Sequence, residues 1–135
     1  MKPTFALICL YTDDNKILIQ DRKSINKYNS EWGLFGGHLK DNETDLQAVI
    51  RETKEELDIK LNKKDLIYVG TVKTPGGEVY TSIFLSKLVT ALKNINVLEG
   101  DGCKLVSEKE CAKLKLTRGD TFRTKLIFSY LKLKN

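Results

Sequence analysis

The sequence predicts an α/β protein in which helices cover a mixed β-sheet. Several short apolar runs, each bounded by glycine, proline, asparagine or aspartate, have the composition of β-strands. Two longer segments, 46–57 and 122–131, space their apolar residues by three and four and therefore predict helices. With 135 residues the chain is long enough for a hydrophobic core, and we expect residues 1–135 to form a single domain.

The first third of the chain predicts strands at residues 4–11, 16–20 and 32–35. The first two form a hairpin around a turn at residues 13–15. Residues 21–30 are polar and irregular, which predicts a loop. The third strand is aromatic and enters Gly36 and Gly37, where the backbone can turn sharply and approach a ligand closely.

A long helix is predicted to follow. Asn42, Thr44 and Asp45 are residue types that cap helix N-termini, and Glu43 is placed in the first turn, where acidic residues suit the helix dipole. One face is apolar and consists of Leu46, Val49, Ile50, Thr53 and Leu57.

Glu52, Glu55 and Glu56 fall together on a second face of this helix. Three carboxylates within two turns repel one another, at about a few tenths of a kcal/mol per pair. A hard divalent cation would neutralise them, since Mg²⁺ and Mn²⁺ prefer oxygen ligands. The alternative from the helix alone is a solvated acidic surface.

The second half predicts a hairpin of strands 66–74 and 78–85 around Pro75-Gly76-Gly77. Residues 86–96 continue as an edge strand or a loop, and 103–106 form a short strand. Ser107 with Glu110 three residues later predicts a capped helix that runs to about Leu114. Asp120 or Thr121 opens the last helix, whose apolar face comprises Phe122, Leu126, Ile127, Tyr130 and Leu131.

The segment 37–59, GHLKDNETDLQAVIRETKEELDI, resembles the signature of the Nudix (MutT-like) hydrolases, G-x5-E-x7-R-E-U-x-E-E-x-G-U, in which U is bulky and aliphatic. The resemblance covers 23 contiguous positions with two departures. Thr53 replaces an aliphatic residue but still offers a methyl group to the core. Asp58 replaces the glycine that ends the helix, and aspartate is among the non-glycine residues that best tolerate the left-handed conformation required there.

The resemblance implies the α/β/α Nudix sandwich and hydrolysis of a phosphoanhydride bond in a nucleoside diphosphate linked to another group. It assigns Glu52, Glu55 and Glu56 to Mg²⁺, for which Mn²⁺ can substitute. It adds the carbonyl of Gly37 as a metal ligand, and it makes Glu52 a candidate base or base-positioning group. Arg51 lies one turn before Glu55 and can orient its carboxylate.

Two further acids extend this assignment. Glu43 is expected to tether Arg51, with ordinary helix-surface pairing as the alternative. Glu99, in a Glu-Gly-Asp-Gly turn, resembles the late glutamate that other family members carry on a loop, so it is a candidate metal ligand or general base. Its alternative role is that of a turn residue capping local amides.

Candidate substrate contacts are Arg22, Trp32, Phe35, His38 and Tyr80. Arg22 and His38 could reach phosphates, although solvated surface positions explain both. Trp32 and Phe35 are candidates for stacking on a base, but short aromatic strands also commonly belong to the core. Tyr80 is a weaker candidate for contact with the base.

The composition indicates the cellular compartment and limits the kinds of metal site that the chain can form. Cys9, Cys103 and Cys111 lack paired spacing, which is typical of free thiols in a reducing cytoplasm rather than of disulfides or a zinc site. No apolar run is long enough to span a membrane, and residues 5–10 lack a cleavage site. His38 is the only histidine, which excludes multi-histidine metal sites.

The net charge of +5 is uneven, since residues 104–135 carry +6 and the rest −1. A basic C-terminal third would attract polyanions, or it is simply a solvated helical surface. Three functions therefore stay open: hydrolysis of small nucleotides or nucleotide sugars, removal of pyrophosphate from a 5′-triphosphorylated RNA, and nucleotide sensing without catalysis. We expect a monomer or a homodimer.

Overall fold

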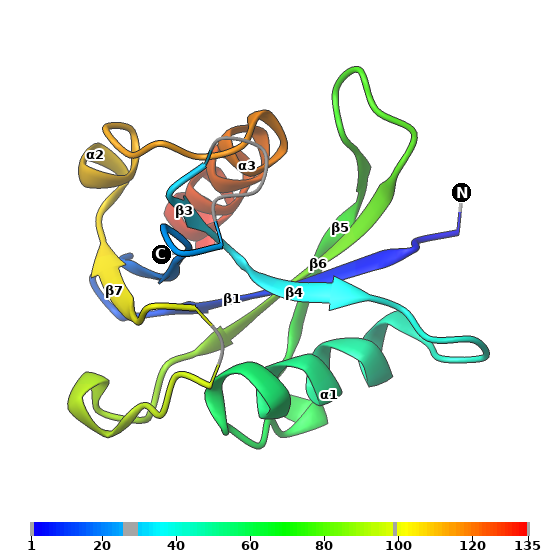
Figure 1. The fold of residues 1–135 in the computed structure, drawn as a ribbon, viewed down its shortest axis with the longest axis horizontal. Coiled ribbons are helices and arrows are strands. Elements are labelled where there is room, and N and C mark those ends of the chain that lie inside the picture. Colours follow the sequence, from blue (N-terminus) through cyan, green and yellow to red (C-terminus); the bar gives the residue numbers. More distant parts are fainter. Residues whose placement is uncertain (1, 26–29, 99, 135) are drawn as a thin grey trace.

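A computed structural model of the chain describes residues 2–25, 30–98 and 100–134. Within these residues the strands are β1 (Phe5–Tyr11), β2 (Ile17–Asp21), β3 (Trp32–Gly33), β4 (Phe35–His38), β5 (Ile67–Lys73), β6 (Tyr80–Lys87) and β7 (Cys103–Val106). They form one mixed sheet in the order β3-β2-β1-β6-β5, with β4 added to β1 and β7 added to β2 (Figure 1). The pair β1–β6 is parallel, and the other pairs are antiparallel.

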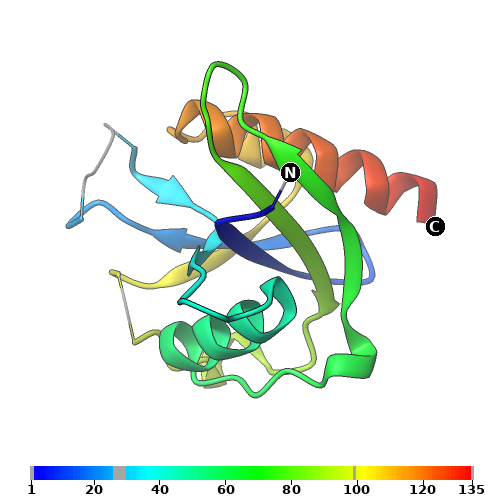
Figure 2. The same ribbon diagram turned by 90° about the vertical axis from the view of Figure 1, so that its right-hand side faces the viewer.

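Helices cover both faces of this sheet. They are α1 (Asp45–Leu57), α2 (Glu108–Cys111) and α3 (Arg118–Lys134), and two 3₁₀ turns occupy Lys63–Asp65 and Leu92–Asn94. Figure 2 shows α1 below the sheet and α3 above it. The predicted α/β class, with a mixed sheet between helices, is therefore confirmed. In the described part of the chain, no helix combines the length and apolarity that a bilayer crossing requires.

Strand β1 explains why the sheet has two cores. Successive side chains of a strand point to opposite faces. Leu7 and Cys9 pack on the α3 side with Ile127 and Leu131. The alternate residues of β1 pack on the α1 side, where they meet Val49 and other residues of α1. Burial of β1 on both faces holds α1 and α3 at fixed positions on either side of it.

The ends of α1 follow from local sequence. Thr44 is the N-cap and forms a reciprocal capping box with Gln47. Glu43 therefore precedes the helix, and its predicted place in the first turn is wrong; Asp45 is the acid of that turn. At the other end Asp58 takes the left-handed conformation, with φ 54° and ψ 35°, as the sequence predicts.

Other boundaries differ from prediction by a few residues. The capped helix at Ser107 ends at Cys111, before the predicted Leu114. The last helix begins at Arg118 rather than Asp120, because Thr117 is the cap: its Oγ1 accepts a hydrogen bond from the Asp120 amide at 3.0 Å. The strand β6 extends to Lys87, and the segment that follows it is a loop with one 3₁₀ turn.

Candidate active site

The two glycines of β4 bring the backbone against α1. β4 pairs with β1, and an added Cβ at Gly36, where φ is +155°, would lie 2.3 Å from the carbonyl oxygen of Ala6. An added Cβ at Gly37 would lie 2.3 Å from Oε1 of Glu52. The missing side chain at position 37 therefore makes room for a carboxylate directly against the backbone of β4.

Arg51 is the centre of an ion-pair network on α1. Its Nε and Nη2 each donate to one carboxylate oxygen of Glu43, both at 2.8 Å. Its Nη1 donates to Glu52 Oε1 at 2.8 Å and to Glu55 Oε2 at 3.2 Å, and Nη2 also reaches the carbonyl of His38 at 3.1 Å. The tether from Glu43 and the contact with Glu55 that the sequence predicted are thus both present.

This network shifts two pKa values in opposite directions. The hydrogen bond from Arg51 is the main cause that lowers the pKa of Glu43 to about 2. The hydrogen bond to Glu43 is the main cause that raises the pKa of Arg51, so the guanidinium stays charged at every relevant pH. A permanent cation therefore lies among the acids of α1.

The three glutamates of the predicted metal site differ in exposure. Glu56 is 2% exposed and accepts a hydrogen bond from the Gly36 amide at 3.1 Å. The side chain of Glu52 is 16% exposed and that of Glu55 is 52% exposed. In the conformation described, no three His, Cys, Asp or Glu side chains among the described residues converge on one ion position.

The reason for this lies in the partners of the carboxylates. Arg51 draws Glu52 and Glu55 toward itself, while Glu56 is turned toward Gly36. The donor set nevertheless fits a hard cation, since it consists of carboxylates beside a glycine whose missing Cβ leaves Glu52 space. For one ion to contact all three carboxylates, their side chains would have to turn toward a common position. Glu99 lies outside the described residues.

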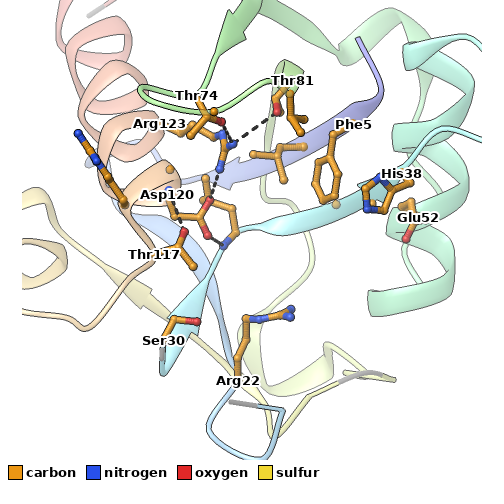
Figure 3. A pocket seen from close by; sticks show the side chains of 18 of the residues that line it. Phe5, Arg22, Ser30, His38, Glu52, Thr74, Thr81, Thr117, Asp120 and Arg123 are labelled. Atoms are coloured by element: carbon orange, nitrogen blue, oxygen red, sulfur yellow. Dashed lines mark hydrogen bonds and ion pairs between the residues drawn. The ribbon is translucent and has the colours of Figure 1, made fainter. Parts of the chain in front are cut away.

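Glu52 and Glu55 lie at one end of a cleft of about 990 Å³ (Figure 3). The cleft crosses the sheet from α1 to the start of α3 and the β5–β6 hairpin. Two of the predicted substrate contacts, Arg22 and His38, line it, and His38 packs edge-on against Phe5 at a centroid distance of 4.8 Å.

The three predicted aromatic contacts lie elsewhere. Phe35 is 1% exposed and packs in the core beneath α1, so its predicted stacking on a base is wrong. Trp32 is not among the described residues that line the cleft; its ring lies under the ammonium groups of Lys23 and Lys104, at 4.7 and 4.2 Å. Tyr80 is half-buried and is also absent from that lining.

The other end of the cleft is a buried ion pair that sequence reasoning missed. Asp120 Oδ1 accepts a hydrogen bond from Arg123 Nη1 at 3.0 Å, and each side chain is 14% exposed. Asp120 Oδ2 faces the Leu34 amide at 3.3 Å, and Arg123 Nη2 donates to Thr74 Oγ1 at 2.6 Å. The only local signal is an acid three residues before an arginine at a helix start, which is common in ordinary helices.

Burial raises the pKa of Asp120, while the neighbouring Arg123 guanidinium acts in the opposite direction and favours the carboxylate. Figure 3 shows the pair on the far side of the cleft from Phe5, His38 and Glu52. The cleft therefore has an acidic, metal-compatible end and a second end built around one ion pair.

The chain is similar to known proteins in sequence and in fold. The model of the NUDIX domain family matches residues 1–127. The chain is 28% identical over 137 residues to an ADP-ribose pyrophosphatase of Methanocaldococcus jannaschii, covering 100% of this chain and 77% of the relative. It is 31% identical over 91 residues to an 8-oxo-dGTP diphosphatase of Proteus vulgaris, covering 67% of this chain and 79% of the relative.

The fold has solved counterparts as well. A structure from a study of MutT from Aliivibrio salmonicida and Vibrio cholerae superposes with a TM-score of 0.76 at 17% identity, covering 96% of this chain and 99% of the other. At that identity the likeness concerns the fold alone. The family match, by contrast, spans nearly the whole sequence, including the helix that carries the glutamates. This chain belongs to the NUDIX domain family and is a Nudix hydrolase.

Proposed function

We propose that the protein is a Mg²⁺-dependent pyrophosphohydrolase of nucleotides, with Mn²⁺ as a substitute. Its substrate is a nucleoside diphosphate linked to another group, such as a nucleoside triphosphate, an oxidised nucleotide or a nucleotide sugar. The observation that supports this most strongly is the set of acids on α1, held by Arg51 at one end of a cleft large enough for a nucleotide. The named substrates of the two relatives, ADP-ribose and 8-oxo-dGTP, both fall in this class.

The residues assigned to the ion are Glu52, Glu55, Glu56 and the carbonyl of Gly37. When bound there, a divalent cation neutralises the charge of phosphate oxygens and lowers the pKa of water. Three acids crowd one helix, and the single guanidinium of Arg51 neutralises only part of their charge. Oxygen donors of this kind favour Mg²⁺ or Mn²⁺ over softer metals.

The chain itself contributes orientation and a proton acceptor. Arg51 occupies Oε1 of Glu52 with a hydrogen bond, so we assign acceptance of the proton from the attacking water to Oε2. Glu43 holds Arg51 from behind through two hydrogen bonds and keeps its guanidinium from swinging away. Glu99 is retained as an alternative base.

Arg22 and Lys40 are the cleft-lining cations that we assign to the phosphates. Both line the cleft together with Glu52 and Glu55. Cations placed beside a transferring phosphoryl group stabilise the negative charge that develops on its oxygens. Arg22 is held by a hydrogen bond from its Nη1 to Gln20 Oε1 at 2.7 Å, which orients its guanidinium.

A panel of nucleoside triphosphates, 8-oxo-dGTP, ADP-ribose and other nucleotide sugars, with products separated by chromatography, tests this proposal. We expect Mg²⁺-dependent cleavage between phosphates in at least one compound. No product from any compound, with Mg²⁺ or Mn²⁺ present, would favour the sensor alternative. Competition by a 5′-triphosphorylated RNA distinguishes the RNA-processing alternative, which predicts strong and salt-dependent inhibition.

A further inference from the structure

The α3 end of the cleft carries more positive than negative charge. Three arginines and one acid line it, Arg22, Arg118, Arg123 and Asp120, so these four side chains have a net charge of +2. Arg22 belongs to this end although it comes from the end of β2: the position of an added Cβ at Gly33 lies 2.8 Å from Arg22 Cδ and 3.2 Å from Asp120 Oδ2. This end of the cleft therefore suits an anion.

Only one of the three arginines is neutralised within the described part of the chain. Arg123 forms an ion pair with Asp120 at 3.0 Å. Arg22 and Arg118 form no ion pair with a described residue. Arg22 donates instead to the neutral side chain of Gln20 at 2.7 Å. A guanidinium group binds phosphate through two parallel hydrogen bonds, so both arginines can take an anion from a ligand.

Arg118 is the arginine that is most open to a ligand. It is exposed, and its Nη1 lies 3.7 Å from the position that an added Cβ at Gly76 would take. Its guanidinium is therefore close to the turn of the β5–β6 hairpin, where this turn and the start of α3 border the cleft.

The start of α3 adds backbone donors to the same wall. Arg118 and Gly119 are the first two residues of the helix, and both line the cleft. Their amides donate no hydrogen bond to a described residue, whereas the next amide, that of Asp120, is capped by Thr117. Uncapped amides and the helix dipole both favour negative charge here, in support of the arginines.

We propose that the α3 end binds a phosphate monoester on the sugar of the substrate, separate from the phosphoanhydride that is cleaved. This inference rests on the proposed function, because it supposes that the phosphoanhydride lies beside the acids of α1. A phosphate monoester carries roughly −1.5 to −2 charges at pH 7, which matches the net charge of this end. A phosphodiester carries only one negative charge and matches it less well.

The chemistry of nucleotides places such a group on the sugar. The common bases carry no anionic substituent at neutral pH, whereas each sugar hydroxyl can be phosphorylated. A cleft of about 990 Å³ lies at the upper end of the range for ligand pockets, so it has room for a nucleotide with an additional phosphate. The substrate class is therefore a nucleotide that is phosphorylated on its sugar as well as in its anhydride.

Calorimetric titration with AMP and with adenosine 2′,5′- and 3′,5′-bisphosphate tests the inference without requiring turnover. We expect one of the bisphosphates to bind about tenfold or more tightly than AMP, because hydrogen bonds between charged groups are worth that much. The same comparison with GMP and the guanosine bisphosphates guards against an effect of the base. The dinucleotide pApA, in which the second phosphate is a diester, should bind less tightly than the preferred bisphosphate.

Arg118→Gln removes the charge from the proposed site, and the advantage of the bisphosphate over the monophosphate should fall about tenfold or disappear. Because Arg118 is exposed, we expect the variant to fold, which circular dichroism checks. Lys125→Gln is the matched control, since it removes a charge from an exposed position of the same helix outside the lining described for the cleft. It should leave the advantage unchanged.

Three results would overturn the inference: bisphosphates that bind no more tightly than monophosphates, an Arg118→Gln protein that keeps the full advantage, or pApA binding as tightly as the bisphosphates. The last result would favour an RNA end as the ligand. ADP-ribose and ADP-ribose 2′-phosphate then separate the two proposals. Equal cleavage of both would refute this inference and leave the proposed function intact, whereas preferential bisphosphate binding without cleavage of any compound would do the reverse.

Discussion

The two ends of the cleft were built in different ways, although they face one another across β1 and β4. The α1 end takes its acids and Arg51 from a single helix and its glycine from the preceding strand. The α3 end joins Asp120 to the Leu34 amide, 86 residues away, and Arg123 to Thr74, 49 residues away. The arrangement of the α1 end therefore follows from the spacing of residues along the chain, whereas the α3 end forms only when distant segments pack together in the tertiary fold.

The difference also separates the expected effects of substitution. At the α1 end the side chains of Glu52 and Glu55 are partly exposed, and their charges are in part neutralised by Arg51. At the α3 end, two buried charges depend on each other. We therefore expect substitutions at the first end to change activity and substitutions at the second to change stability first.

The largest effect is expected for Glu55→Gln, which we predict lowers kcat/KM about a thousandfold by removing a carboxylate assigned to the metal. Because Glu55 is about half exposed, the melting temperature should change little. Coupled phosphate-release assays and thermal melts measure both quantities. Glu31→Gln, at an exposed acid outside the lining described for the cleft, is the control. Near wild-type activity at saturating Mg²⁺ would refute the role assigned to Glu55.

At the opposite end, Arg123→Ala should lower the free energy of unfolding by about 3 kcal/mol, because it leaves the Asp120 carboxylate buried without its cation. Urea denaturation followed by circular dichroism measures this. Arg118→Ala provides the comparison, since that arginine is exposed at the same helix start and its loss should change stability by about 0.5 kcal/mol or less. Equal losses of stability for Arg123→Ala and Arg118→Ala would show that the Asp120–Arg123 ion pair contributes no more to stability than an exposed arginine does.

Gly37→Ala tests the contact between β4 and α1. The new Cβ would overlap the Glu52 carboxylate, which must then move away. A displacement of about 1 Å at a reacting group costs up to about a hundredfold in rate, whereas the flexible side chain can shift at about 1 kcal/mol or less in stability. Steady-state kinetics and denaturation together check this. A loss of stability without a loss of activity would contradict it.

The smallest expected effect is a change with pH in the stability that Glu43→Gln removes. The pKa of Glu43 is about 2 in the folded protein against an ordinary value of 4.5. A lowered pKa means that the contribution to stability is complete above the ordinary value and is lost as the pH falls toward 2. The difference in free energy of unfolding between wild type and variant should therefore shrink across that interval. A difference that does not change with pH would show that Glu43 is not held by Arg51.

The sequence predicted features that depend on neighbouring residues better than features that depend on contacts between residues far apart in the chain. The strands 103–106 and 4–11, the cap at Ser107 and the left-handed Asp58 were predicted because neighbouring residues determine them. The start of α3 was missed because Arg118-Gly119 reads as a loop until Thr117 is seen to cap it.

The same distinction between local and long-range contacts applies to the candidate site. The Glu43–Arg51 tether was predicted from an eight-residue spacing on and before one helix. For Phe35 the sequence left both base stacking and core burial open, because a four-residue strand does not reveal which face it buries, and the structure shows burial in the core. Asp120 could not be predicted, since its role depends on packing that brings α3 beside Leu34 and the β5–β6 hairpin.

The parallel pairing of β1 with β6 also has a consequence for biosynthesis. Phe5 pairs with Thr81, so β1, which precedes β6 in the chain, cannot complete its part of the sheet until residues 80–87 have been synthesised. Contacts of such long sequence separation slow folding. The apolar strand β1 therefore stays unpaired on one side while more than half of the chain is translated. During that interval the nascent protein is most prone to aggregate.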